Sequence, residues 1–139
     1  RRQRQMCIRD SWGIVVREDN PVASKTFADG QTISSLRVIL PRRAIVRSEI
    51  KTWFSDLVKD ENVVMYHNLP SLSLHFIGSG IGDALLCVEG AYSIRPSSGL
   101  RFVPLAPERL ARHKFVRRKN HRLSKAGEIF WSQLRNPDR

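Results

Sequence analysis

The sequence predicts an α/β fold. Short runs of β-branched and other apolar residues recur along the chain and are typical of buried strands. Between and after them, apolar residues also recur at three- and four-residue spacing, which indicates amphipathic helices. Gly, Pro, Asn and Asp separate these segments and indicate turns. Because strands alternate with helices, we expect a mostly parallel sheet covered by helices on both faces.

The first elements follow one another in that alternation. Residues 12–17 form a short apolar run that predicts a buried strand, and the Asp-, Pro-, Ser- and Gly-rich residues 18–30 predict a loop. A second strand is expected over residues 36–40, stopped by Pro41. Residues 43–59 predict an amphipathic helix. Its buried face is expected to comprise Val46, Ile50, Trp53, Phe54 and Leu57.

The later elements are shorter. Beyond a turn at residues 60–62, the sequence predicts strands over 63–66, 84–88, 100–103 and 114–118, a helix over 71–79 opened by Pro70, and a loose polar stretch over 92–99. Ser124 is suited to be the N-cap of a final helix that Pro137 ends. Ala126, Ile129, Phe130 and Leu134 form one apolar face of that helix.

The first eleven residues, RRQRQMCIRDS, resemble a translated sequencing adapter. One reading frame of an adapter for transposon-based library preparation encodes every residue of the run. Segments of this kind are set aside before composition is interpreted. We therefore expect residues 1–11 to be an artefact that forms no domain and has no packing role. The natural chain is then expected to start at about Trp12, inside a larger protein.

The charge favours an anionic partner. The formal net charge is +11, and residues 1–11 supply four arginines and one aspartate of it, which leaves +8 for the rest. A basic balance favours nucleic acid or an anionic ligand. Cys87 remains as a single cysteine in an apolar run, which excludes an internal disulfide and favours a core residue. The chain has no apolar run of the ~18 residues that a membrane span needs.

No catalytic or metal-binding pattern stands out. The four histidines, His67, His75, His113 and His121, lack ligand-like spacing with one another or with Cys or Asp. No Ser/His/Asp set has a recognisable order, and Ser97-Ser98-Gly99 lacks the nucleophile-elbow pattern. We therefore expect neither an enzyme, nor a metal site, nor a cofactor.

A ligand site is predicted at one edge of the sheet. Pro41, Arg42, Arg43 and Ala44 lie between a strand's carboxyl end and a helix N-terminus, where open α/β sheets bind ligands and anions are favoured. An arginine there can hold a carboxylate bidentately, although both could equally be solvated. Asn68 and Leu69 end the next strand at the same edge, but Asn68 could instead bond its own backbone in a turn. These six residues are the candidate site.

The glycines of Gly80-Ile81-Gly82 are interpreted as a structural turn. A dinucleotide-binding loop needs a strand before its glycines and a helix after them. Here the predicted order is the reverse, so the phosphate-binding interpretation fails. Gly80 and Gly82 are expected to supply positive φ and close packing at a helix C-terminus.

Several motifs, taken in order, resemble the effector-binding domain of LysR-type transcriptional regulators. The family's D-H-P-L-A, G-L-G, F-x-P-L and W-K-K-x-x-x-x-S-K-A motifs correspond to Asp19-Asn20-Pro21-Val22-Ala23, Gly80-Ile81-Gly82, Phe102-Val103-Pro104-Leu105, and Arg117-Arg118-Lys119 through Ser124-Lys125-Ala126. I-L-P-R-R and Tyr66-His67-Asn68-Leu69 also occur in the family's order. The resemblance covers residues 12–137. Asn20, Asp83 and Arg117 depart from the family's usual residues and leave the ligand open.

The resemblance implies a function. Such regulators combine a winged helix-turn-helix with an effector domain of two periplasmic-binding-protein-like α/β subdomains. Residues 12–137 would supply the second subdomain and the last strand and helix of the first; the DNA-binding part and most of the first subdomain would be missing. The implied protein is a cytoplasmic bacterial regulator, homo-oligomeric when full length, that binds a small anionic or polar effector and contacts DNA only through its missing N-terminal domain.

Two other functions remain open. A periplasmic-type solute-binding protein shares the implied fold and would need an export signal. A small basic nucleic-acid-binding protein would use the run of residues 117–122 against phosphates and would bind in a strongly salt-sensitive way. That run has no aromatic residues for base stacking, which favours a solvated surface.

Overall fold

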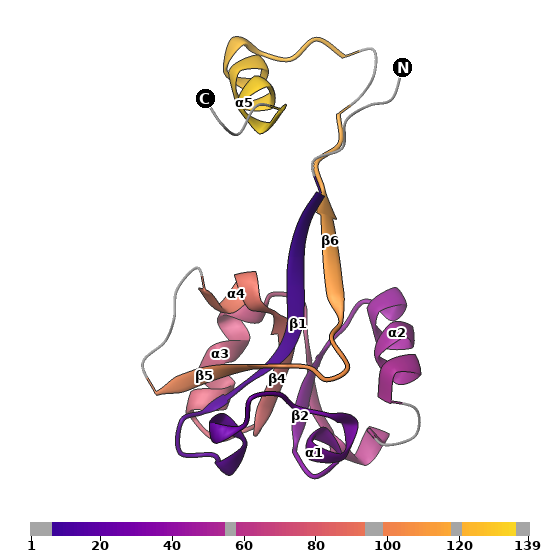
Figure 1. Ribbon diagram of the computed structural model, residues 1–139, viewed down its shortest axis with the longest axis vertical. Helices are drawn as coiled ribbons and strands as arrows, with labels where there is room; N and C mark the ends of the chain where they lie inside the picture. The colour runs from indigo at the N-terminus through magenta and orange to yellow at the C-terminus, as the bar shows by residue number, and fades with distance from the viewer. Residues whose placement is uncertain (1–6, 55–57, 94–98, 118–120, 136–139) are drawn as a thin grey trace. The chain divides into compact units, whose positions relative to one another are not determined.

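The structure, a computed structural model, describes residues 7–54, 58–93, 99–117 and 121–135. The chain divides into two units, which are described separately. The larger unit is Asp10–Ala111, and the smaller unit combines Arg1–Arg9 with Arg112–Arg139. Figure 1 gives the labels of the elements.

The larger unit is built on a mixed sheet with the strand order β3-β2-β4-β1-β5. The strands are β1 (Cys7–Arg17), β2 (Val38–Pro41), β3 (Val63–His67), β4 (Ala84–Val88) and β5 (Leu100–Pro104). β2 pairs in parallel with β3 and β4, whereas β1 pairs antiparallel with β4 and β5. The expected α/β fold is confirmed, but the expected mostly parallel sheet is wrong. Runs buried on both faces identify strands without fixing their direction.

The central strands are buried on both faces. Ile14 and Val16 of β1 belong to one apolar cluster, whereas Val15, between them, belongs to the other. β4 alternates in the same way, with Leu86 in the first cluster and Leu85 in the second. This alternation is the two-residue period of a strand between two covering layers, so every residue in the middle of these strands is apolar or glycine.

Helices cover the two faces of the sheet. The first cluster also takes side chains from η1 (Pro21–Ser24), α1 (Gly30–Ser34) and α2 (Ala44–Phe54). The second takes them from α3 (Pro70–Gly78) and α4 (Glu89–Ser93). Figure 1 shows α3 and α4 on one side of the sheet and α2 on the other. α4 overlaps the predicted loose stretch 92–99 and was not predicted.

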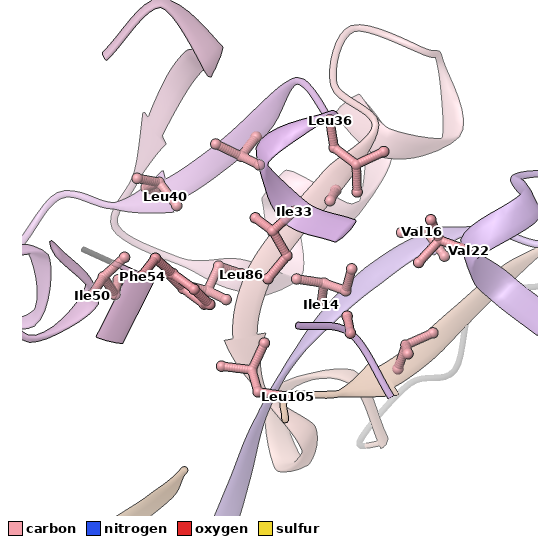
Figure 2. Close-up of a cluster of buried hydrophobic side chains, with 14 of the residues drawn as sticks. Ile14, Val16, Val22, Ile33, Leu36, Leu40, Ile50, Phe54, Leu86 and Leu105 are labelled. Carbon is pink, nitrogen blue, oxygen red and sulfur yellow. The ribbon is translucent and has the colours of Figure 1, made fainter. Parts of the chain in front are cut away.

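The buried face of α2 is largely as predicted. Ile50 and Phe54 are buried, and Val46 and Trp53 are partly buried against the same cluster. Figure 2 shows Ile50 and Phe54 in one cluster with Leu86 of β4. Leu57 lies outside the described residues. The apolar spacing predicts this face because its side chains gain free energy when α2 packs them against the sheet and away from water.

The expectation that residues 1–11 have no packing role is wrong at Asp10. β1 begins at Cys7, so the strand includes part of that segment. The Asp10 carboxylate accepts hydrogen bonds from the backbone N–H of Gly90, at 3.0 and 3.2 Å from its two oxygens. Arg9 is exposed and Ser11 is half-buried. The segment extends an existing strand because its backbone can continue the ladder whatever its side chains are.

The turn after α3 uses its two glycines differently. Gly80 has a φ of +79°, which favours glycine. A Cβ on Gly82 would lie 2.9 Å from Cγ1 of Ile39, so a side chain would collide with β2. The Arg37 guanidinium holds the turn in place by donating hydrogen bonds to Asp83 Oδ1 (2.8 Å) and to the carbonyl oxygen of Gly80 (2.9 Å). The turn therefore brings β4 close beside β2.

The final elements differ from expectation in one strand. β6 is Leu110–Lys114 and pairs with β1. The predicted strand at 114–118 is wrong for residues 115–117, which are not in a strand, and its last residue lies outside the described residues. The side chains of β6 are mostly exposed, so its sequence lacks a burial pattern. In the smaller unit, α5 (Lys125–Arg135) is capped as predicted, because Ser124 Oγ accepts from the Gly127 N–H (3.2 Å). Ile129 and Phe130 on its predicted apolar face are each 52% exposed.

Candidate ligand-binding site

A pocket of about 400 Å³ lies where β2, β3 and β4 end. These three strands run in parallel, so their carboxyl ends meet at one edge of the sheet, and α2 begins there at Ala44. The lining residues are Trp12, Pro41, Arg42, Arg43, Val46, His67, Asn68, Pro70, Cys87 and Val88. The edge expected from the sequence therefore carries a pocket.

Four of the six predicted site residues line this pocket. Pro41, Arg42, Arg43 and Asn68 do so, and all of them come from the ends of β2 and β3. Ala44 and Leu69 are not among the lining residues: Ala44 starts α2, and Leu69 is the exposed residue before α3. Residues from the same strand ends are thus brought together, but not every neighbour in sequence reaches the pocket.

The sequence reasoning missed six lining residues: Trp12, Val46, His67, Pro70, Cys87 and Val88. Cys87 and Val88 end β4, which was predicted as a strand but not as a neighbour of β2. Trp12 comes from β1, on the far side of β4. A signal for His67 existed, because this polar residue directly follows a predicted strand beside Asn68.

The two arginines lie on a fixed loop. The backbone N–H of Arg42 donates to the carbonyl oxygen of His67 (2.8 Å), which extends the β2–β3 ladder past the end of β2. The carbonyl oxygen of Arg43 accepts from the N–H of Arg47 (2.9 Å) in the first turn of α2. Both arginine side chains are exposed. None of the pocket's lining residues is acidic, so the pocket has a positive rim.

The His67 side chain connects two strands that are not neighbours in the sheet. Its Nε2 lies 3.3 Å from the carbonyl oxygen of Leu86 on β4, although β2 stands between β3 and β4. β2 and β4 pair at Val38–Ala84 and Ile39–Leu85, and Leu86 is the next residue of β4. The imidazole therefore links β3 to β4 just beyond the positions at which β2 and β4 pair. It is 8% exposed, and burial lowers its pKa, opposed by the bond to Leu86.

Cys87 contributes an apolar surface to the pocket and is not a reactive thiol. Burial, with a smaller contribution from the negative charge of Asp10, raises the pKa of its thiol to about 12. A thiol is nucleophilic only as the thiolate, so Cys87 stays protonated and unreactive at neutral pH. This agrees with its interpretation as a core residue.

Two further pockets lie elsewhere in the larger unit. One of about 370 Å³ lies between α2 and the edge strand β3, where the Arg47 guanidinium stacks 5.2 Å from the Tyr66 ring centroid. Its lining includes both Lys51 and Asp60, so its charge is mixed. Another of about 290 Å³ is lined by Asp29, Trp53 and Arg109, among others. Neither has the two free cationic side chains that the pocket at the strand ends offers.

Within the described ranges, no group of three or more His, Cys, Asp or Glu side chains is arranged to hold a metal ion. None of the described helices is long and apolar enough to cross a membrane.

The comparisons with known proteins give structural neighbours only. Neither a protein-family model nor a curated protein sequence matches the chain significantly. HinK, a LysR family transcriptional regulator from Pseudomonas aeruginosa, is 18% identical with a TM-score of 0.64. The match covers 94% of this chain and 46% of HinK, so the chain spans about half of that regulator's length.

Two binding proteins are similar in the same way. The effector-binding domain of QuiR, solved in complex with shikimate, is 16% identical with a TM-score of 0.67, over 91% of this chain and 60% of that one. ArtJ, an arginine-, lysine- and histidine-binding protein from Geobacillus stearothermophilus, is 12% identical with a TM-score of 0.61, over 93% and 53%. At these identities the likeness establishes the fold: the chain has the periplasmic-binding-protein-like α/β fold of LysR-type effector-binding domains.

Proposed function

We propose that this chain is the effector-binding part of a LysR-type transcriptional regulator, and that the pocket at the ends of β2, β3 and β4 binds a small anionic or polar effector. The observation that carries the proposal is the convergence at that pocket of three strand ends, two exposed arginines and the start of α2, with no acidic residue in the lining. Effector sensing then needs binding only, and no catalytic group.

The chemistry of the pocket suits a carboxylate. Arg42 and Arg43 can each donate two parallel hydrogen bonds to one, and such charge-assisted pairs are stronger than neutral ones. The backbone N–H groups in the first turn of an 11-residue helix lack partners within the helix, and the helix dipole adds to the attraction. Ala44 would contribute through this backbone. Asn68 can bond a second polar group, and Leu69 would cover the outer side of the ligand.

The regulator would respond by a shift between conformations. A ligand changes such an equilibrium only through contacts that differ between the two states. A pocket at the sheet edge meets that condition if the first subdomain closes over it. In the proposed assignment, residues 12–137 supply the second subdomain and the last strand and helix of the first. DNA binding and homo-oligomerisation would then depend on parts of the regulator that this chain lacks, together with exposed apolar side chains such as Val64 and Tyr66 on β3.

A solute-binding protein is the second candidate, and the likeness to ArtJ favours it. The coding sequence upstream of Trp12 separates the two. A helix-turn-helix there supports the regulator, whereas an export signal supports the solute-binding protein. The pocket assignment is common to both.

The pocket is tested by protein-observed NMR titration of this chain with acetate, propionate, succinate and benzoate at millimolar concentrations. We expect the signals of the pocket residues to shift. Arg42→Ala or Arg43→Ala should weaken binding about tenfold, since one charge-assisted hydrogen bond contributes about 1.5 kcal/mol. Arg101→Ala is the matched control, because Arg101 is an exposed arginine on β5 outside the pocket lining. If both pocket variants bind with unchanged affinity, the arginines are surface residues and the site is wrong.

A further inference from the structure

The pocket at the strand ends has two chemically different parts. Arg42 and Arg43 lie on the loop before α2, and both are exposed. His67 and Asn68 are the other polar lining residues, and neither adds a charge at pH 7, since burial lowers the pKa of His67. The rest of the lining is apolar and comprises Trp12, Pro41, Val46, Pro70, Cys87 and Val88. The pocket therefore joins a cationic rim to a largely apolar lining.

Three of the apolar residues belong to one side of the sheet. Trp12 and Val88 are direct partners in the antiparallel pairing of β1 with β4, so their side chains lie on the same face. That face is the one that α2 covers, because Leu86, two residues before Val88, belongs to the first apolar cluster. Val46 of α2 and Trp12 are partly buried against the same cluster. Trp12, Val46 and Val88 therefore continue the hydrophobic core to the pocket, and we call them the apolar wall.

The apolar wall is preformed but incompletely covered. Trp12, Val46 and Val88 are each half-buried, so part of their surface remains in contact with water. The Trp12 ring makes an edge-to-face contact with Trp53, at 5.5 Å between the ring centroids, which helps to fix its position. An apolar group that covers a preformed wall releases water from it without a large cost in conformational entropy.

An apolar ligand body suits this wall better than a polar one. The hydroxyl groups of a sugar would lose water against the wall and find few partners in the lining, which costs free energy. An ammonium group would lie near Arg42 and Arg43 with no acidic lining residue to pair with it, so amino acids are disfavoured. A dicarboxylate could use both arginines, but it would leave the apolar wall uncovered.

We propose that the ligand is a monocarboxylate with an apolar body, such as a medium-chain or aryl-substituted acid, whose carboxylate binds Arg42 or Arg43 and whose body covers the apolar wall. The inference rests on the carboxylate site proposed above and adds the part of the ligand that determines specificity. The pocket volume of about 400 Å³ leaves room for such a body beside the carboxylate.

The test is a chain-length series of acetate, butyrate and hexanoate, measured on this chain by protein-observed NMR titration. Each added methylene should tighten binding about two- to fourfold, so hexanoate should bind at least about tenfold more tightly than acetate. The backbone signals of Val46 and Val88 and the indole N–H signal of Trp12 should shift more with hexanoate. Adipate, the matched six-carbon dicarboxylate, and hexanamide, the uncharged analogue, should both bind more weakly than hexanoate.

A conservative variant tests the wall itself. Val88→Thr keeps nearly the same shape but places a hydroxyl in the wall, so the ratio of hexanoate to acetate affinity should fall about two- to fourfold. Val64→Thr is the matched control, because Val64 is a strand valine on β3 that is 42% exposed and outside the pocket lining. It should leave this ratio unchanged. A melting temperature reports the folding of each variant, and the series on the unmodified chain gives an answer even if Val88→Thr unfolds.

The outcomes distinguish the inference from the proposed function. Equal affinity along the series, or tighter binding of adipate than of hexanoate, would overturn the inference, while the carboxylate site stands if Arg42→Ala or Arg43→Ala weakens binding. A chain-length effect that a folded Val88→Thr variant leaves unchanged would put the apolar body elsewhere and would also overturn the inference. If hexanamide binds as tightly as hexanoate, or if none of the acids binds, both the site and the inference fail.

Discussion

The docking of α2 on the sheet can be tested by truncating Phe54 to Ala. Phe54 is 5% exposed and packs in the cluster that joins α2 to β1 and β4 (Figure 2). A phenylalanine side chain buries at least about 150 Å². At about 25 cal/mol per Å² this transfer contributes roughly 4 kcal/mol, and Phe→Ala changes in cores cost about 3–5 kcal/mol. We expect a loss of that size in the free energy of unfolding.

The assay is urea unfolding followed by circular dichroism, because Trp53 lies beside the substitution and would perturb a fluorescence signal. Phe27→Ala is the matched control, since Phe27 is 52% exposed and should cost less than about 1 kcal/mol. A loss for Phe54→Ala that is no larger than for Phe27→Ala would refute the docking of α2, and with it the placement of Arg42 and Arg43 at the pocket.

Two more predictions concern the sheet and the turn. Gly13→Ala should lower the free energy of unfolding by about 1–3 kcal/mol, because its Cβ would collide with the Phe102 ring and lie 2.6 Å from the Val103 carbonyl oxygen. A urea unfolding midpoint equal to that of the unmodified chain would contradict this prediction. Asp83 has its pKa lowered chiefly by hydrogen bonds from Arg37, so its contribution to stability should be complete above about pH 4 and decline as the pH falls through its lowered pKa. The difference between the urea midpoints of the unmodified chain and Asp83→Asn should therefore be full at pH 7 and shrink as the pH falls below about 4. A difference that does not change with pH would contradict a stabilising interaction between Arg37 and the ionised Asp83.

The sequence by itself determined the class of fold and most of its elements. The runs at Ile14–Val16 and Leu85–Cys87 are apolar on consecutive positions, and only a strand between two covered faces buries all of them. The spacing of Ile50 and Phe54 likewise predicted the buried stripe of α2. The strand β6 and the short helix α4 escaped prediction because their exposed or half-buried side chains carry no burial pattern.

The candidate site was predictable in part, because its first half depends on local order alone. Pro41, Arg42 and Arg43 follow a strand and precede a helix, and Asn68 ends the next strand, so the rule for open α/β sheets places them at one edge. The other half depends on which strands are neighbours. Trp12 and Cys87 reach the pocket only because β1 and β4 lie next to the parallel strands.

Tertiary structure decided strand direction, strand order and the state of His67. The sequence places His67 at the end of a strand, but its bond to Leu86 joins residues on two strands separated by β2. That contact falls just beyond the two positions at which β2 and β4 pair, and it exists only because the sheet brings β3 and β4 to the two sides of β2. The burial of His67 and its bond to Leu86 are properties of this three-dimensional arrangement, because each depends on groups that are far apart along the chain.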